Sequence, residues 1–287
     1  MNDFVCNICG STTPGHVTRR IDQPDRFERS MGISEKDYQR QWVICDLCGV
    51  AVNLMSDASR EAVTNLGASY YEVDLGGGDK LMKKYNRVMS LPDMKSDNAL
   101  RVDRILSYLR SHAHSKKTIR ICDVGSGLGV FLSKVFAVFG LYGIHDIDAV
   151  GVEPDPTSFA FLQKLGLFPV RCGFFPEAVS DEVYDLITLN KVLEHIENPR
   201  QLLSACGKHL TFSGLLYVEV PCVSNLRLKA QDDNSLGSLH NNLYDLASLS
   251  KLLRIAGFTS VFGERIIEPS GKISVYVFAK KTDTLSP

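Results

Sequence analysis

The chain has 287 residues, of which 44% are hydrophobic and 23% charged, and its formal net charge is −1 at pH 7. This length and composition suit one α/β domain of ordinary size plus a smaller appendage, and the near-neutral charge argues against a dedicated nucleic-acid binder. Because no apolar run is long enough to cross a bilayer and the N-terminus carries no export signal, we expect a cytoplasmic protein with no membrane partner.

Two cysteine knuckles stand near the N-terminus, Cys6-Asn-Ile-Cys9-Gly and Cys45-Asp-Leu-Cys48-Gly. In each knuckle two thiolates can reach one metal ion, and the glycine permits the tight turn beneath them. Two disulfides or a redox motif are the alternatives, which a reducing compartment and the duplication of the pair make weaker. Since four thiolates leave no position for water, we expect a closed, structural zinc site with the ligands Cys6, Cys9, Cys45 and Cys48.

The sequence predicts two regions ahead of the main domain. Residues 1–58 form the small zinc-binding module, with short strands at 42–45 and 50–54. The gap between the knuckles is longer than in a compact zinc ribbon, so we expect an insertion at about 19–40 to loop out. Residues 59–116 are expected to form a helical linker or lid.

Residues 117–287 alternate strand-like and helix-like segments, a pattern typical of a largely parallel sheet. Periodicity alone does not order the strands within that sheet. The expected strands are 119–124, 149–154, 169–172, 184–190, 214–221, 260–267 and 273–280. The expected helices are 128–139, 156–165, 199–210 and 245–256.

A glycine-rich turn, Asp123-Val-Gly-Ser-Gly-Leu-Gly129, directly follows the first of these strands. Its glycines allow unusual backbone angles and let the chain approach a ligand closely. A dehydrogenase turn would use backbone N–H groups to bind a pyrophosphate. The acidic residue ahead of this turn suits the amino group and sulfonium of S-adenosylmethionine better, so the dehydrogenase alternative is the weaker one.

Two further motifs follow the next strands. Gly151-Val-Glu-Pro154 ends a strand in a carboxylate, at a position from which it can accept from ribose hydroxyls. The segment 184–190 runs into Leu193-Glu-His-Ile-Glu-Asn-Pro199. With the glycine turn, these motifs resemble the class I S-adenosylmethionine-dependent methyltransferases, from about Arg101 to the C-terminus. The resemblance implies a seven-stranded Rossmann-like sheet whose last strand is antiparallel.

The same resemblance implies an S-adenosylmethionine site at the strand ends. Phe174 either packs against the adenine ring or belongs to the ordinary core. The other implied contacts are Asp123 for the amino group, Gly125, Ser126 and Gly127 for the methionine portion, Glu153 for the ribose, Pro154 beside the adenine and Asn190 next to the sulfur.

An N-terminal double-knuckle module joined to this core resembles the sugar C-methyltransferases of deoxysugar and polysaccharide pathways. The stretch His240-Asn-Asn-Leu-Tyr244, ahead of a helix ending near Ala256-Gly-Phe258, supports this resemblance but also occurs in O-methyltransferases. We therefore expect methyl transfer to a small molecule, with a nucleotide-linked sugar as the leading acceptor. The alternatives are O- or N-methylation of another small molecule, and an RNA methyltransferase gripping its substrate through the zinc module, against which the charge argues.

Methyl transfer needs an aligned acceptor and a group that removes its proton. His240 is the leading candidate base, because the loop after the fifth strand faces the substrate in this family. Glu219, near the end of that strand, is a second candidate. His195 is a third, although packing or cofactor orientation is its favoured role. Tyr70, Tyr71 and Tyr85 are expected to reach the pocket as lid residues.

Overall fold

The computed structural model describes residues 4–13, 15–36, 38–66, 79–112 and 118–282. Its larger sheet has seven strands in the order β10-β11-β8-β7-β4-β5-β6. The strands β4 to β8 run parallel, whereas β11 pairs antiparallel with both β8 and β10. The predicted seven-stranded Rossmann-like sheet is therefore confirmed, with the strands β4 (Thr118–Val124), β5 (Asp146–Glu153), β6 (Val170–Cys172), β7 (Tyr184–Asn190), β8 (Leu210–Pro221), β10 (Phe258–Ile267) and β11 (Ile273–Lys281).

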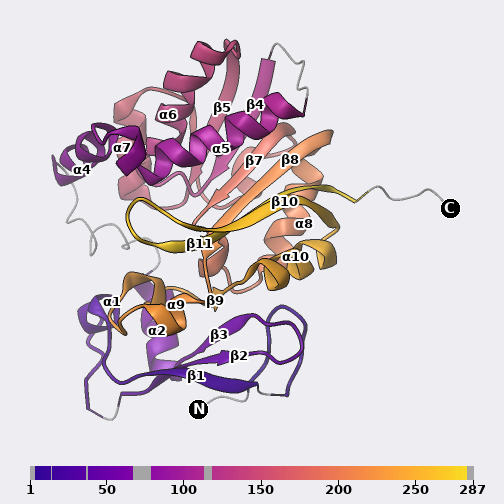
Figure 1. Cartoon of the computed structure of the whole chain (residues 1–287). Coiled ribbons are helices and arrows are strands. Elements are labelled where there is room, and N and C mark those ends of the chain that lie inside the picture. The colour runs from indigo at the N-terminus through magenta and orange to yellow at the C-terminus, as the bar shows by residue number, and fades with distance from the viewer. Residues whose placement is uncertain (1–3, 14, 37, 67–78, 113–117, 283–287) are drawn as a thin grey trace.

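Helices cover both faces of this sheet, as Figure 1 shows. Successive residues of a strand point to opposite faces, so in β7 Leu186 packs into one hydrophobic cluster and Ile187 into the other. None of the helices in the described ranges is both long and apolar enough to span a membrane. One face carries α4 (Asp79–Met89), α5 (Asp97–Ser111), α6 (Val130–Phe139) and α7 (Pro156–Leu165), and the other carries α8 (Pro199–His209) and α10 (Leu246–Ile255).

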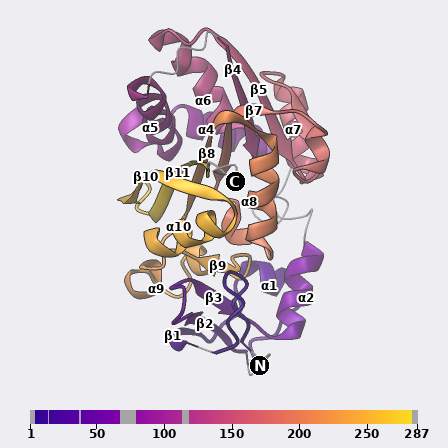
Figure 2. The same cartoon turned by 90° about the vertical axis from the view of Figure 1, so that its right-hand side faces the viewer.

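A second sheet of four strands, in the order β1-β2-β3-β9, lies below the larger one (Figures 1 and 2). Its strands are β1 (His16–Ile21), β2 (Arg40–Ile44), β3 (Ala51–Leu54) and β9 (Asn242–Leu243). The expected insertion at about 19–40 is present between β1 and β2, but its two ends are not loops, because residues 19–21 belong to β1 and Arg40 begins β2, with which β1 pairs antiparallel. The chain between these strands carries α1 (Arg26–Ser30), whose N-terminus is closed by a capping box of Asp25 and Glu28.

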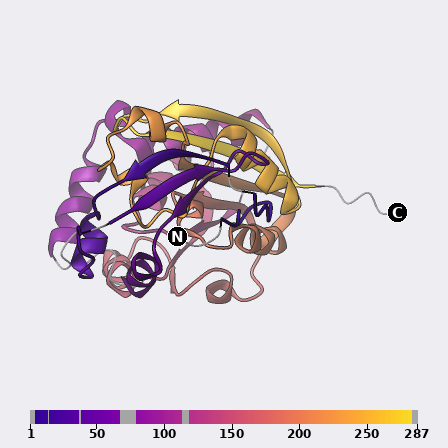
Figure 3. The ribbon, with the colours of Figure 1, turned by 90° about the horizontal axis from the view of Figure 1, so that it is seen from below.

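The N-terminal module and the main domain are built into one another. Strand β9 comes from the C-terminal half of the chain, yet it pairs with β3. The buried Arg40 guanidinium donates to the Leu236 carbonyl at 2.6 Å, and the Asn53 amide donates to the His240 carbonyl at 2.8 Å. Seen from below in Figure 3, the strands of the module lie across the end of the core. The N-terminal module therefore holds in place the loop that carries His240.

Tyr85 does not behave as a lid residue. Its ring is buried in α4, and its hydroxyl donates to Ser133 Oγ of α6 at 2.9 Å. It therefore joins two helices on the far side of the sheet from α8 and α10, which corrects the prediction for this residue. Tyr70 and Tyr71 lie outside the described residues.

Candidate functional site

The carboxyl ends of β4, β5 and β7 open onto a cleft of about 2020 Å³, which α1, α2 (Asp57–Leu66) and the loop 229–241 bound on its other sides. Ligands of open α/β sheets bind at this edge, where the strand order reverses. Small-molecule pockets usually measure ~300–1,000 Å³. The cleft therefore has room for a cofactor together with an acceptor.

The glycine turn after β4 has left-handed backbone angles, with φ of 71° at Gly125, 56° at Gly127 and 72° at Gly129. L-residues with a side chain rarely adopt these angles. A Cβ added at Gly125 would also lie 2.7 Å from Cγ2 of Val192, a residue of the chain that follows β7. The turn is thus packed too closely for any larger residue, and Gly125 lines the cleft.

Glu153 ties this turn to the end of β5. Its carboxylate is 3% exposed and accepts from the backbone N–H of Gly127 at 2.7 Å and from that of Asp155 at 2.9 Å. Burial raises the pKa of Glu153 to about 7, although the two backbone hydrogen bonds oppose the shift. Each carboxylate oxygen keeps further lone-pair capacity, so the group can still accept from a ligand hydroxyl in the cleft.

The side chains of Asp123 and Asn190 connect β4 to β7 by a hydrogen bond. The buried Asp123 carboxylate accepts from the Thr188 hydroxyl at 2.6 Å and from Asn190 Nδ2 at 2.8 Å. Because a carboxylate only accepts, Nδ2 must point to Asp123 and Oδ1 away from it. Asn190 lines the cleft, and its Oδ1 is buried without a hydrogen-bond partner among the described residues. An unpaired buried acceptor of this kind suits the ammonium group of a ligand.

The remaining predicted cofactor contacts have different surroundings. Ser126 is turned back into its own loop, where its hydroxyl donates to the Asp123 carbonyl at 2.8 Å. Pro154 lines the cleft. Phe174 also lines it and is 72% exposed, so this ring is not part of the core, whereas its neighbour Phe175 is buried.

Glu219 is enclosed by cations instead of facing the cleft. Its fully buried carboxylate accepts from Arg101 Nε at 3.0 Å, from Arg104 Nη2 at 2.6 Å and from the Tyr217 hydroxyl at 2.6 Å, and Lys191 Nζ lies 3.3 Å away. These cations outweigh desolvation and hold the pKa of Glu219 well below its usual range. The sequence predicts that Glu219 opens onto the acceptor, but here its carboxylate is buried and Glu219 is not among the residues that line the cleft.

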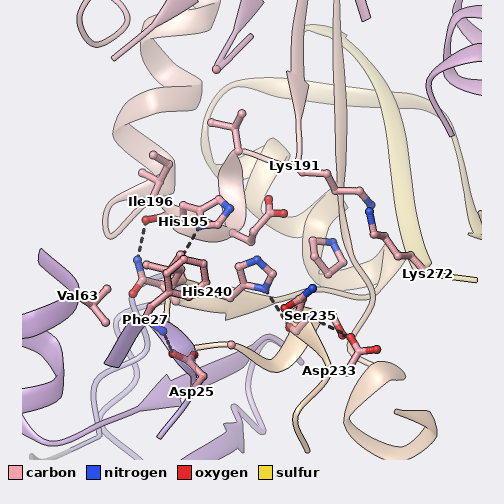
Figure 4. A pocket seen from close by; sticks show the side chains of 18 of the residues that line it. Asp25, Phe27, Val63, Lys191, His195, Ile196, Asp233, Ser235, His240 and Lys272 are labelled. Atoms are coloured by element: carbon pink, nitrogen blue, oxygen red, sulfur yellow. Dashed lines mark hydrogen bonds between the residues drawn. The ribbon is translucent and has the colours of Figure 1, made fainter. Parts of the chain in front are cut away.

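His195 and His240 come together in the cleft from opposite sides, as Figure 4 shows. Their ring centroids are 4.7 Å apart. His195 Nδ1 donates to the Leu239 carbonyl and His240 Nδ1 to the Ser235 carbonyl, both at 2.9 Å. Since a carbonyl only accepts, the proton of each neutral ring sits on Nδ1, and each Nε2 carries a lone pair. Desolvation lowers the pKa of both rings, that of His240 to about 3.

Glu194 lies beside His195 and His240, and these three residues form a cluster in the cleft. Glu194 was not identified as a site residue from the sequence. It precedes His195 in a 3₁₀ turn, η5 (Leu193–His195), which aims both side chains at His240. One ligand atom each from Glu194, His195 and His240 lies within 4.8 Å of the others. Glu194 is 1% exposed, and burial raises its pKa to about 8. Glu194 belongs to the motif Leu193-Glu-His, which the sequence had singled out. Only the geometry of the turn shows that the Glu194 side chain lies beside His240.

The four N-terminal cysteines also come together. The Sγ atoms of Cys6 and Cys48 are 3.5 Å apart, those of Cys9 and Cys45 are 3.7 Å apart, and all four lie within 4.8 Å of one another. A disulfide would need about 2.05 Å, so the disulfide alternative does not hold. Four convergent sulfur atoms are the donor set of a structural zinc site.

Cationic side chains from three helices are among those that line the cleft. They leave this wall of the cleft suited to an anionic group of a ligand. The residues are Arg26 of α1, Arg60 of α2, and Lys84 and Arg87 of α4.

A family described as a methyltransferase domain matches residues 93–261 of the chain. Because the match covers more than half of the sequence, the protein belongs to this methyltransferase family. A ubiquinone biosynthesis O-methyltransferase from Photobacterium profundum is 27% identical over 117 residues, covering 39% of this chain and 48% of its own. Another from Burkholderia vietnamiensis is 25% identical over 177 residues, covering 58% of this chain and 72% of its own. The chain spans about half the length of the first of these curated relatives.

Solved methyltransferase structures share the fold. Magnesium protoporphyrin IX methyltransferase from Synechocystis PCC 6803, with bound SAH, aligns with a TM-score of 0.55 at 14% identity, covering 76% of this chain and 100% of its own. The plantazolicin methyltransferase BpumL, also with SAH, aligns with a TM-score of 0.55 at 16% identity, covering 77% and 99%. These likenesses show a Rossmann-like methyltransferase fold.

Proposed function

We propose that the protein transfers a methyl group from S-adenosylmethionine to a small-molecule acceptor. The observation that carries this proposal is the presence of two acceptors at strand ends in one cleft, the Glu153 carboxylate and the Oδ1 of Asn190, which has no hydrogen-bond partner among the described residues. A ligand with ribose hydroxyls at one end and an ammonium group at the other fits that pair. Family membership and the shared fold support the same activity.

Each part of this cofactor has its own contact residues in the cleft. Glu153 would accept from the ribose hydroxyls, and Asn190, oriented by Asp123, would accept from the ammonium group. Gly125 lets the methionine portion approach the backbone, while Pro154 and the exposed Phe174 offer apolar surface to the adenine. The bound cofactor supplies a methyl group made electrophilic by its sulfonium, so the protein chiefly has to align the acceptor.

We assign the removal of the acceptor's proton to the cluster around His240. The Nδ1–H of His240 is fixed on the Ser235 carbonyl, so its Nε2 lone pair is available to the cleft. Once ionised, Glu194 lies close enough to stabilise an imidazolium there. Because these groups interact strongly, they would titrate as one unit. We assign His195 the role of orienting His240.

For the acceptor we propose a sugar linked to a nucleotide. The cations Arg60 and Arg87 of the cleft lining support this choice, since they would meet a diphosphate. The names of the relatives point instead to a phenolic hydroxyl as acceptor. Either acceptor offers an oxygen or an activated carbon to the methyl group.

We also propose that the four cysteines bind a structural zinc ion. Cys45 and Cys48 lie in the turn between β2 and β3, and β3 pairs with β9. The ion would thereby stabilise the sheet that positions His240. It has no position open to a substrate.

A transfer assay with a panel of acceptors tests the proposed function. The purified protein, S-adenosylmethionine and each acceptor are incubated, and release of S-adenosylhomocysteine is measured for nucleotide-linked sugars, free sugars and catechols. We expect turnover with a nucleotide-linked sugar, and a KM at least fivefold higher in Arg87→Gln. Lys83→Gln is the matched control, because this exposed cation of α4 does not line the cleft. Turnover with catechols alone would reject the sugar, and no turnover with any acceptor would count against the activity.

A further inference from the structure

A second asparagine of the cleft lining, Asn225, has an accepting oxygen that receives no hydrogen bond from the described residues. Asn225 lies in the short helix α9 (Asn225–Leu228), which follows β8. It is 1% exposed, and its Oδ1 has no hydrogen-bond partner among the described residues. A buried acceptor in this state costs free energy unless a donor reaches it. Asn225 therefore points to a ligand that donates a hydrogen bond.

Two hydrogen bonds to one carbonyl fix the orientation of the Asn225 amide. Asn225 Nδ2 donates to the Ile273 carbonyl at 3.0 Å, and the backbone N–H of Cys222 donates to the same carbonyl at 2.9 Å. Because a carbonyl oxygen only accepts, a flipped amide would place Oδ1 against the Ile273 oxygen. Oδ1 is therefore the end of the amide that is left for a ligand.

The strand order separates Asn225 from the residues assigned to the cofactor. Glu153 and Asn190 end β5 and β7, whereas Asn225 follows β8, which lies on the other side of β7 from β4 and β5. Neighbouring strands lie ~4.7–4.9 Å apart. A cofactor bound across the ends of β4, β5 and β7 would leave the part of the cleft beyond β8 to the acceptor.

The charges near Asn225 favour a neutral donor over a cationic one. Lys229, four residues further along, also lines the cleft and donates to the Gly271 carbonyl at 2.6 Å, two residues from the carbonyl that Asn225 contacts. A neutral carbonyl does not cancel the charge of Lys229, so a second ammonium group would be repelled there. A hydroxyl group donates a hydrogen bond without adding charge.

We propose that Asn225 Oδ1 accepts a hydrogen bond from a hydroxyl group of the acceptor, and that Asn225 thereby selects a polyhydroxylated acceptor such as a sugar. An amide oxygen is too weak a base to remove a proton near neutral pH, so this hydroxyl keeps its proton. It is therefore a different group from the one that is methylated, which must face the methyl group of the cofactor. The inference rests on the proposed function, because it names what the same cleft recognises in its acceptor.

Asn225 would reject an acceptor that lacks this hydroxyl. Without the hydroxyl, Oδ1 stays buried and unpaired in the complex. A site built around a hydrogen bond discriminates strongly against such an analogue, whereas an apolar wall discriminates weakly. The value of kcat/KM should therefore fall sharply when one particular hydroxyl is removed from the acceptor.

Analogues of the acceptor that lack one hydroxyl each test this inference. The value of kcat/KM is measured for the nucleotide-linked sugar that the acceptor panel identifies and for its monodeoxy analogues, in the unmodified protein and in Asn225→Ala. We expect one analogue to lose at least tenfold with the unmodified protein, and Asn225→Ala to lose at least tenfold with the parent sugar. In Asn225→Ala the same analogue should lose less than about threefold against the parent sugar, because both changes remove one shared interaction.

Ser270→Ala is the matched control. It removes the hydrogen bond from the exposed Ser270 hydroxyl to Asp97, which holds the turn between β10 and β11, but it leaves Asn225 in place. We expect this variant to keep kcat/KM for the parent sugar, and the preference against the deoxy analogue, within about twofold. Asn225→Ser gives a second reading where Asn225→Ala does not fold, since the serine side chain is too short to reach the same hydroxyl.

Two results would overturn the inference. One is turnover of the parent sugar without a tenfold loss for any analogue in the unmodified protein. The other is a loss for the analogue that adds fully to the loss in Asn225→Ala, because Asn225 would then support the fold without contacting that hydroxyl. Either result rejects the inference alone, whereas a lack of turnover with every sugar rejects the proposed acceptor and the inference with it.

Discussion

Glu219 holds together a buried ion network that joins α5 to β8, and its neutralisation gives a sharp prediction. In Glu219→Gln, Arg101 and Arg104 would lose their shared carboxylate at a position where Glu219 and Arg101 are at most 5% exposed. Removing one partner of a buried pair typically costs about 3–5 kcal/mol, because the remaining charge stays buried. Glutamine keeps one accepting oxygen, so we expect the free energy of unfolding to fall by about 3 kcal/mol.

Urea unfolding followed by circular dichroism measures this loss. Glu264→Gln is the matched control, since this exposed carboxylate of β10 accepts from the Tyr276 hydroxyl, and we expect a change within about 0.5 kcal/mol. Replacing Arg101 and Glu219 together by methionine should cost less than the two single changes added together. Unchanged stability of Glu219→Gln combined with lost turnover would refute this reasoning and restore Glu219 as the base.

Three further outcomes follow from the site. Gly125→Ala should weaken S-adenosylmethionine binding at least tenfold by calorimetry, because its Cβ meets Val192, whereas Gly143→Ala, also at a left-handed φ but with open space around it, should not; equal affinities would contradict the close approach. Glu153 has a raised pKa of about 7 and accepts from ligand hydroxyls best when ionised, so cofactor affinity should rise with pH through 7 and fall by up to about tenfold per unit below it; a flat profile would remove Glu153 from the site. Cys45→Ser should abolish stoichiometric zinc by elemental analysis and lower thermal stability; retained zinc would contradict the four-cysteine site.

The main sheet could be predicted closely, because buried parallel strands are short apolar runs bounded by turns. The expected strand 184–190 coincides with β7, and the expected helix 156–165 coincides with α7. Prediction from the sequence was less accurate for the N-terminal sheet. Its strand β1 is largely exposed, and β9 has two residues whose partner lies far away in the sequence.

The candidate site, like the fold, could be predicted from the sequence only in part. Glu153 and Asn190 could be placed at the cleft from sequence, because both end a predicted strand. The burial of Glu219 depends on Arg101, 118 residues earlier in the chain, so strand periodicity gives no sign of it. The meeting of His195 and His240 likewise depends on how the N-terminal sheet holds the loop before β9.

Calorimetric titration with S-adenosylmethionine tests the central claim most directly, because it needs no acceptor. We expect micromolar binding, roughly −7 to −8 kcal/mol, and a loss of about 1–3 kcal/mol in Glu153→Ala, because the ribose hydroxyls lose a charged acceptor. Tight binding of NAD with no binding of S-adenosylmethionine would contradict the account.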